Sequence, residues 1–157
     1  TTDEEEISRI TDLENNLTSD DSVIKNLSFE PSKIPESLNE KYRYEGYVYD
    51  SVTYNPDNSQ PANTVRRLYR KMDSNGVLVI EESTLENAQS SLVKEFVNAS
   101  VSDSAAMYAI NKSPSNKEYS LLTWNGAKHS YTLYQYGDNT TQQELLEIAE
   151  NLTKINN

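Results

Sequence analysis

The sequence contains no cysteine, which excludes disulfide bonds, thiolate catalysis and cysteine-ligated zinc sites. Its only histidine is His129, so a metal site with two histidine ligands is excluded too. The four glycines are scattered over predicted turns, and the sequence has no glycine-rich loop that could hold a phosphate. No serine stands in a Gly-x-Ser-x-Gly motif. The common motifs of metal, nucleotide and nucleophile chemistry are therefore missing.

Basic residues are also scarce. The chain has 14 Lys and Arg against 25 Asp and Glu, and its formal net charge is −11. Residues 1–21 alone carry −7 of that charge. Nucleic acids and anionic membranes attract clustered Lys and Arg, so this balance argues against both partners. We interpret the acidic surface as a contribution to solubility.

Long hydrophobic runs are missing as well. No apolar run approaches the roughly 18–20 residues of a membrane span, and no signal-peptide pattern is present. The apolar residues nevertheless recur periodically, which predicts one folded domain within the 157 residues. The chain begins Thr1-Thr2 without Met, so we expect a fragment or mature form whose anchor would lie upstream.

The most informative stretch is residues 119–155. Residues 119–124 and 128–136 read as two strands, joined at Asn125-Gly126 by a type I′ turn in which both residues need positive φ. Thr141 and Glu144 fit a capping box that starts a helix. An apolar stripe at helical spacing follows, made of Leu145, Ile148, Ala149, Leu152 and Ile155.

The N-terminal part is more polar. Residues 2–17 predict an acidic helix, which would lie on the sheet or serve as a spacer to an upstream anchor. Residues 18–41 form a connector broken by Pro31 and Pro35. We expect a domain at 27–157, preceded at 1–26 by the acidic helix and its connector, in one compact unit.

Residues 42–54 predict a strand rich in tyrosine. Gly46 sits at an odd step between two alternating pairs, which indicates a bulge that moves the tyrosines to the other face. The tyrosines are either an aromatic platform for a sugar or flat ligand, or strand residues that cover the sheet. With the single tryptophan they make the candidate ligand or partner surface: Tyr42, Tyr44, Tyr47, Tyr49 and Trp124.

Residues 64–72 and 77–84 predict a hairpin whose turn is residues 73–76. Its first strand holds the only basic cluster, which we expect to pair with Glu81 or Glu82; an anion site is the alternative. Residues 85–104 stay ambiguous, and 105–111 read as another strand. The fold class is α+β: a curved antiparallel meander of five to seven strands with an N-terminal and a C-terminal helix. The basic cluster is Arg66, Arg67, Arg70 and Lys71.

No constellation predicts catalysis. His129 is interpreted as a solvated strand residue, and the adjacent Glu81 and Glu82 should point to opposite faces of their strand. Asp73-Ser74-Asn75-Gly76 lacks the ligand spacing of a calcium loop. We therefore expect no catalytic residue, no cofactor, no metal and no enzymatic activity.

The C-terminal half resembles a known family. Leu122-Thr123-Trp124, Tyr131-Thr132-Leu133 and the helix at 144–152 follow the pattern of extracytoplasmic domains of unknown function in Gram-positive bacteria. Those domains occur C-terminal to a membrane helix in anti-sigma-factor-like and sporulation-associated proteins. Upstream, Ile34-Pro35-Glu36-Ser37 is similar to their Leu-Pro-Glu-Gly step, with Ser37 in place of Gly. A more distant similarity links the chain to the curved sheets of lipoprotein carriers and envelope-stress regulators.

The resemblance implies a non-catalytic sensor or interaction domain, extracytoplasmic and anchored through a membrane helix or lipid. Its partner would be an unknown protein or lipid at the cell envelope, and the chain would be a monomer. The alternative is a carrier whose sheet curves around an acyl chain, with a cavity near Trp124, Leu133 and Leu146. Ordinary packing of helix on sheet explains the same three residues without a cavity.

Overall fold

The computed structural model describes residues 17–18, 27–48, 63–85, 97–112, 118–137 and 141–156. The helix predicted over residues 2–17 lies outside this range except at its end, where Leu17 belongs to a strand. Tyr49 and the rest of the segment 49–62 lie outside it as well. The described strands are β1 Leu17–Thr18, β2 Tyr42–Val48, β3 Thr64–Lys71, β4 Val77–Thr84, β5 Ala99–Val101, β6 Ser104–Lys112, β7 Glu118–Asn125 and β8 His129–Tyr136; the helices are η1 Glu36–Glu40, a 3₁₀ helix, and α3 Gln142–Asn156.

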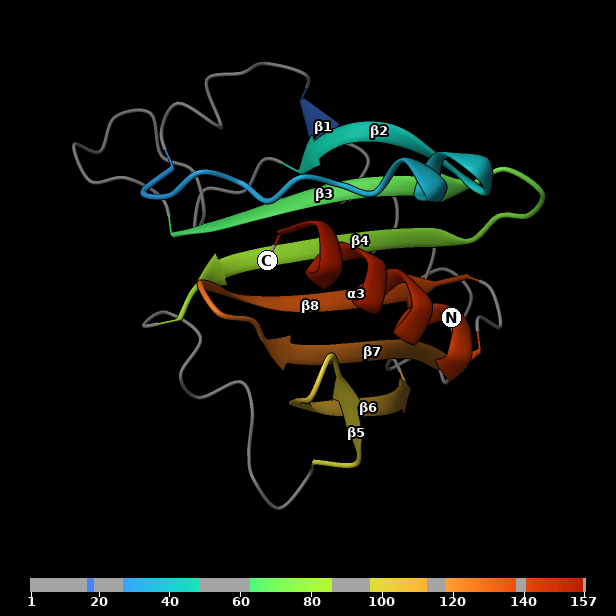
Figure 1. Cartoon of the computed structure of the whole chain (residues 1–157). Helices are drawn as coiled ribbons and strands as arrows, with labels where there is room; N and C mark the ends of the chain where they lie inside the picture. The colour runs from blue at the N-terminus through green and yellow to red at the C-terminus, as the bar shows by residue number, and fades with distance from the viewer. Residues whose placement is uncertain are drawn as a thin grey trace.

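The strands form one antiparallel sheet in the order β1-β2-β3-β4-β8-β7-β6-β5 (Figure 1). Seven strands have three or more residues, and the two-residue β1 extends the sheet beside β2. The class α+β and the antiparallel sheet are thus confirmed. Because β1 pairs with β2, the predicted boundary at residue 26 does not separate the sheet from the N-terminal part.

The predicted meander is wrong at one step, because β4 pairs with β8 and not with β5. Two four-strand runs therefore meet at the middle of the sheet. Residues 77–80, Val-Leu-Val-Ile, are all buried, which is the pattern of a strand covered on both faces. Such a strand is most stable at the centre of the sheet, and the β4–β8 pairing puts it there.

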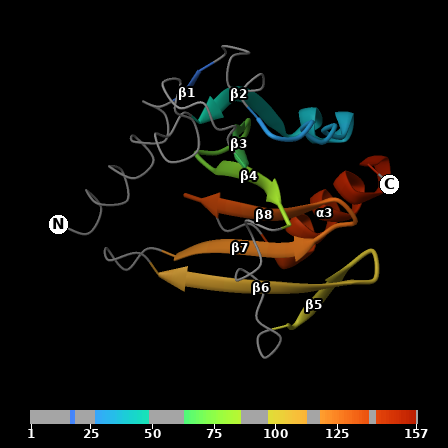
Figure 2. The ribbon, with the colours of Figure 1, turned by 90° about the vertical axis from the view of Figure 1, so that its left-hand side faces the viewer.

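The helix α3 packs across one face of the sheet (Figures 1 and 2). We call this the helix face. The Thr141 half of the predicted capping box is present, since the Thr141 hydroxyl accepts the Glu144 N–H at 3.2 Å. Leu145, Ala149 and Leu152 of the predicted stripe are buried, whereas Ile155 is exposed.

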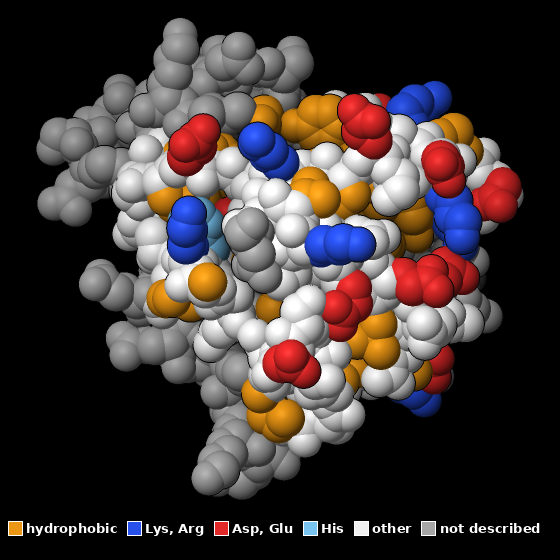
Figure 3. All heavy atoms as spheres, viewed as in Figure 1, with side chains coloured by type: hydrophobic (Ala, Val, Ile, Leu, Met, Phe, Trp, Pro, Cys, Tyr) orange, Lys and Arg blue, Asp and Glu red, His pale blue; other side chains and the backbone are white. Residues whose placement is uncertain are grey.

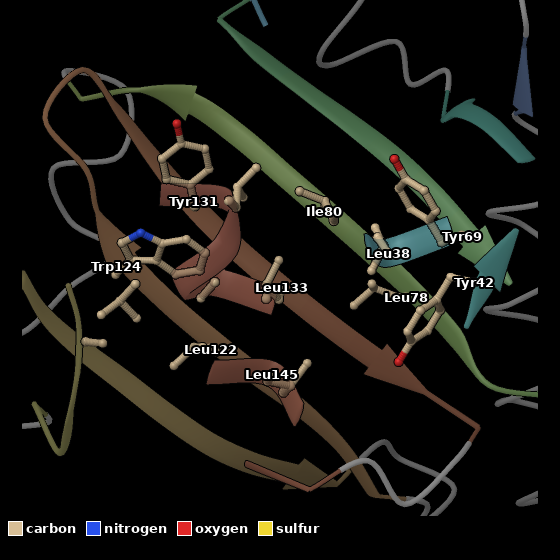
Figure 4. Close-up of a cluster of buried hydrophobic side chains, with 14 residues drawn as sticks. Leu38, Tyr42, Tyr69, Leu78, Ile80, Leu122, Trp124, Tyr131, Leu133 and Leu145 are labelled. Carbon is tan, nitrogen blue, oxygen red and sulfur yellow. The ribbon is translucent and has the colours of Figure 1, made fainter. Parts of the chain in front are cut away.

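Three cross-strand rows of side chains lie on the helix face, as the register of the strands shows. The central row is apolar at its middle: Arg67, Ile80, Leu133, Leu122, Tyr108. On one side of it lies the Glu82 row: Val65, Glu82, Tyr131, Trp124, Ala106. On the other side lies the Gln135 row: Tyr44, Tyr69, Leu78, Gln135, Ser120. Figure 4 shows most of the apolar members of these rows, among them Ile80, Leu133, Leu122, Trp124, Tyr131, Tyr69 and Leu78.

The β7–β8 hairpin is confirmed, but its turn differs from the prediction. None of residues 125–128 has positive φ, so the type I′ turn at Asn125-Gly126 is wrong. Gly126 donates its N–H to the His129 carbonyl at 2.8 Å, which leaves Ala127 and Lys128 at the tip. A Cβ on Gly126 would lie 3.0 Å from the Tyr131 ring, so this glycine allows a close approach.

A pair of consecutive residues with positive φ occurs instead in the hairpin between β5 and β6. Ser102 and Asp103 have φ of 48° and 71°, between the paired residues Val101 and Ser104. The Glu150 carboxylate of α3 accepts hydrogen bonds from the Ser102 N–H and hydroxyl at 2.8 and 2.6 Å. This contact ties the turn to the helix in a region that the sequence left ambiguous.

The bulge predicted at Gly46 is confirmed by the register shift between Tyr44 and Gly46. Its effect is the reverse of the prediction. Tyr44 pairs with Tyr69 and Tyr47 pairs with Arg67, and these partners lie two residues apart on the same face of β3. The extra residue therefore keeps Tyr47 on the helix face, where its ring lies 6.0 Å from that of Tyr44.

The β3–β4 hairpin and its cross-strand ion pairs are confirmed. Arg66 lies 3.0 Å from Glu81 on one face, and Arg67 lies 3.7 Å from Glu82 on the other. Each member of the basic cluster has a carboxylate partner, which leaves little support for an anion site there. The other two pairs are Arg70 with Glu45 at 3.4 Å and Lys71 with Glu144 at 3.6 Å.

Candidate functional site

A cleft of about 520 Å³ opens on the helix face at the His129 end of β8. Three segments form its walls. Residues 27–35, which we call the strap, form one; the β7–β8 loop forms the second; the last turn of α3 forms the third. The lining residues are Glu30, Pro31, Ser32, Lys33, Gly126, Ala127, Lys128, His129, Tyr131, Thr153, Ile155 and Asn156.

A buried carboxylate organises the polar groups beside this cleft. Glu82 is 1% exposed, and its carboxylate accepts the Ser32 N–H at 3.0 and 3.2 Å. It also accepts the Ser32 hydroxyl at 2.7 Å, and His129 Nδ1 lies 2.6 Å from it. Since Ser32 stands in a segment without a β-ladder, Glu82 supplies the acceptor that its backbone needs.

Arg67 and Tyr131 complete the cluster. Arg67 Nη2 donates to the Ser32 carbonyl at 2.9 Å, and the hydroxyls of Ser32 and Tyr131 share a hydrogen bond of 2.6 Å. Burial raises the pKa of the Tyr131 hydroxyl, which is therefore neutral and able to donate. We call Ser32, Arg67, Glu82, His129 and Tyr131 the buried polar cluster.

The strand register explains why these residues meet. Glu82 stands directly opposite Tyr131, and Thr84 stands opposite His129, so all four lie at one end of the β4–β8 pair. Residues two apart on a strand share a face, so His129 and Tyr131 both face the helix side. The strap then crosses this end, and the Phe29 ring packs 4.5 Å from the His129 ring.

A second contact fastens the strap to α3. The Asn156 side chain accepts the Lys33 N–H at 2.8 Å and donates to the Lys33 carbonyl at 2.8 Å. Together with the Ser32 contacts, it fixes consecutive strap residues to both the sheet and the helix. Burying the Glu82 charge is costly unless it is paired and hydrogen-bonded, and this cluster meets both conditions.

The cluster does not have the geometry of a nucleophile triad. In a triad the serine hydroxyl bonds to the histidine, and the histidine bonds to the acid. Here the Ser32 hydroxyl bonds to Glu82 and Tyr131. The His129–Glu82 contact fixes the ring and leaves Nε2 as the ring nitrogen that a ligand can reach. The arrangement therefore suits binding better than acyl transfer.

Sequence reasoning missed this site. The prediction that Glu81 and Glu82 face opposite ways is confirmed, but the interpretation of His129 as a solvated residue is wrong. Its side chain is 16% exposed and is bonded to Glu82. A signal was present, because Glu82 follows Leu78 and Ile80 at alternate positions and so belongs to the core face. The sequence around Glu82 does not indicate that its partner is His129, which lies 47 residues further along the chain.

The predicted surface of tyrosines and tryptophan is not assembled. Tyr42 and Trp124 are buried in the core, and Trp124, at 0% exposure, stacks on Tyr131 at 5.1 Å. Tyr44 is 43% exposed, and its ring meets that of Tyr47 edge-on, so the two do not form a flat platform. Burial of the rest of the side chain disfavours the charged form and raises the pKa of the Tyr44 hydroxyl. Tyr49 lies outside the described residues.

Two further clefts among the described residues are smaller. One of about 170 Å³ lies between η1 and the first turns of α3. Leu146 lines a depression on the outer side of α3 with Ser100 and Glu150. In the described part of the chain no group of three or more His, Asp or Glu side chains is placed to hold a metal ion. No helix there is long and apolar enough to cross a membrane.

Comparisons with protein-family models, with curated proteins and with solved structures found no match for this chain. The resemblance to the Gram-positive extracytoplasmic domains therefore stays a prediction from sequence.

Proposed function

We propose that this chain is a non-catalytic sensor or interaction domain, extracytoplasmic in a membrane- or lipid-anchored bacterial protein, and that the cleft is its recognition site. The observation that carries the proposal is the way one buried carboxylate holds the cleft walls. Glu82 binds the strap through Ser32 and β8 through His129, while Asn156 joins the strap to α3. A cleft whose walls are fixed before binding loses little entropy when a ligand enters.

Two features favour binding over catalysis. The Ser32 hydroxyl is engaged by Glu82 and Tyr131, so it is not poised as a nucleophile. The cleft lining contains a single carboxylate, Glu30, whereas acid–base hydrolysis of glycosides needs a facing pair. Location at the envelope and the curvature of the sheet rest on the sequence resemblance, whereas the N-terminal helix rests on the pattern of residues 2–17.

The sensor is favoured over the acyl-chain carrier because of the core beneath α3. Trp124 and Leu133 are fully buried, and they belong to the same packed cluster as Leu145 and Leu152 of the helix (Figure 4). Leu146 is partly buried against this cluster and also lines a surface depression near Ser100. The three residues expected around an acyl chain thus do not line a common space among the described residues.

Hydrogen–deuterium exchange with a detergent-solubilised envelope fraction of Gram-positive cells tests the proposal. We expect protection at residues 30–33, 126–129 and 153–156, without turnover of the added material. Ala127→Trp should remove the protection by filling the cleft, whereas Ala105→Trp, at an exposed alanine on β6, should keep it. Protection that Ala127→Trp leaves unchanged would contradict the site.

Protease accessibility tests the location. On intact cells that express the full-length parent protein, an extracytoplasmic domain is cleaved by added protease. A domain that is cleaved only after lysis contradicts the proposed location and leaves the cleft as a binding site elsewhere.

A further inference from the structure

The cleft is positively charged within a strongly acidic chain. Lys33 and Lys128 line it, and Glu30 is the only acidic residue in its lining. No described carboxylate lies within ion-pair distance of either lysine, whereas the four residues of the basic cluster are all paired. Figure 3 shows the single histidine beside a Lys or Arg side chain on this face. Because the chain as a whole carries −11, the local excess of positive charge has to attract an anion against the general field.

One ring nitrogen in the cleft is also left for a ligand. The Nδ1 atom of His129 is committed to Glu82, which leaves Nε2. Thr153 lines the cleft too, but its hydroxyl oxygen is itself buried, so we do not count it among the ligand groups.

Three features oppose an anion in the cleft: the Glu30 carboxylate of the lining, the Glu82 carboxylate behind His129, and the C-terminal end of α3, where backbone carbonyls carry partial negative charge. The Asn156 side chain reduces the effect of the helix end. Its Nδ2 donates to the Leu152 carbonyl at 2.7 Å and to the Lys33 carbonyl at 2.8 Å. Two carbonyl oxygens near the cleft are thereby satisfied within the protein.

We propose that the cleft binds an oxyanion, a phosphate or carboxylate group. Lys33 and Lys128 supply the charge, and His129 supplies an Nε2–H donor when its ring carries protons on both nitrogens, since Nδ1–H is directed at Glu82. The inference rests on the proposed function in taking the cleft as the recognition site, and it adds the chemical class of the ligand. A carboxylate or phosphate is the group for which ammonium ions and N–H donors are the usual partners.

Calorimetric titration of the chain with inorganic phosphate, and separately with succinate, tests this proposal. We expect saturable binding of at least one anion with a dissociation constant of about 1 mM or tighter. The double variant Lys33→Gln/Lys128→Gln should weaken it at least about tenfold, because charge supplies most of the attraction.

A matched control removes the same charge elsewhere. Lys41→Gln/Lys112→Gln neutralises two exposed lysines outside the cleft, and binding should change less than about twofold. Glu30→Gln should strengthen binding several-fold, because it removes the acidic residue of the lining. Equal losses in the two double variants, or no saturable binding of either anion, would overturn the proposal.

Vesicles distinguish a lipid headgroup from a free anion. If phosphatidylglycerol vesicles bind the chain, phosphatidylcholine vesicles do not, and free phosphate competes, the oxyanion is a headgroup. Binding of free anions alone assigns it to a soluble molecule or polymer; binding of vesicles that free anions cannot displace contradicts an oxyanion site.

If an envelope fraction protects the cleft while neither anion binds, the oxyanion inference fails and the proposed function survives. If anions bind but the envelope fraction does not protect the cleft, the proposed function fails and the oxyanion inference survives.

Discussion

Glu82 and Gln135 are buried on the same face of the sheet, but only Glu82 has hydrogen-bond partners among the described residues. Glu82 is 1% exposed and binds Ser32, with His129 and Arg67 beside it. Gln135 is 0% exposed, and neither its amide nitrogen nor its amide oxygen has a hydrogen-bond partner among the described residues.

The difference lies in what crosses each row. The strap crosses the Glu82 row and brings the donors of Ser32 to the carboxylate, and the cleft opens there. The Gln135 row has Leu78 and Ser120 as the neighbours of Gln135 across β4 and β7. Glu82 therefore has hydrogen-bond partners because the strap, which lies outside the sheet, supplies them. We infer that the Glu82 row supports the proposed recognition cleft, whereas the unpartnered Gln135 amide lowers the stability of the fold.

The largest expected effect is the loss of the carboxylate. Glu82→Gln should lower the free energy of unfolding by about 3–5 kcal/mol, because it leaves the buried Arg67 and Ser32 donors without their charged partner. Urea titration measures this. The matched control is Glu81→Gln, next in sequence but paired with Arg66 at the other, more exposed face, where the loss should stay below about 1 kcal/mol. If both variants lose similar free energy of unfolding, the Glu82 carboxylate does not stabilise the fold more than an ordinary surface carboxylate does.

The second prediction concerns the orphaned amide. Gln135→Leu should raise the free energy of unfolding by about 1–2 kcal/mol, because it replaces an unsatisfied buried amide with an apolar side chain of similar size. Gln143→Leu, on the exposed surface of α3, should stay within about 0.5 kcal/mol of the wild type. A destabilised Gln135→Leu variant would show that the amide has a partner, such as an ordered water.

The smallest effect is the pH dependence that Tyr69 contributes. Burial raises the pKa of Tyr69, in the Gln135 row, to about 12, against an ordinary value of 10.0. The unfolded chain therefore loses this proton first, and stability present below pH 10 declines as the pH rises toward 12. At pH 11 the loss from Tyr69 should be about 1.4 kcal/mol. Tyr69→Phe should flatten this part of the curve of unfolding free energy against pH; an unchanged slope would contradict the assignment to Tyr69.

Much of the fold could be predicted because its determinants are local. The strands at 77–84 and 128–136, the Gly46 bulge and the Thr141 cap each depend on a few neighbouring residues. The opposite faces of Arg66 and Arg67 followed from alternation alone. The structure contains these features because tertiary contacts reinforce the local preference.

The site could not be predicted, since it depends on which strands pair. Glu82 and His129 meet only through the β4–β8 pairing, and a strand pattern does not state its partner. The turn at Gly126 was misassigned because the glycine serves the approach of Tyr131 and not a positive φ. Ser102 and Asp103 hold the two positive φ values without a glycine, and Glu150 of the distant helix supports that turn.

The central claim is that Glu82 holds the strap in place and thereby shapes the cleft. Amide hydrogen exchange of Ser32, followed by NMR, tests it most directly, because the Ser32 N–H is bonded to the Glu82 carboxylate and not to a β-ladder. The account predicts slow exchange of this amide in the wild type, exchange at least about tenfold faster in Glu82→Gln, and little change in Glu81→Gln. A Ser32 amide that exchanges in the wild type as fast as an exposed loop amide would contradict the account.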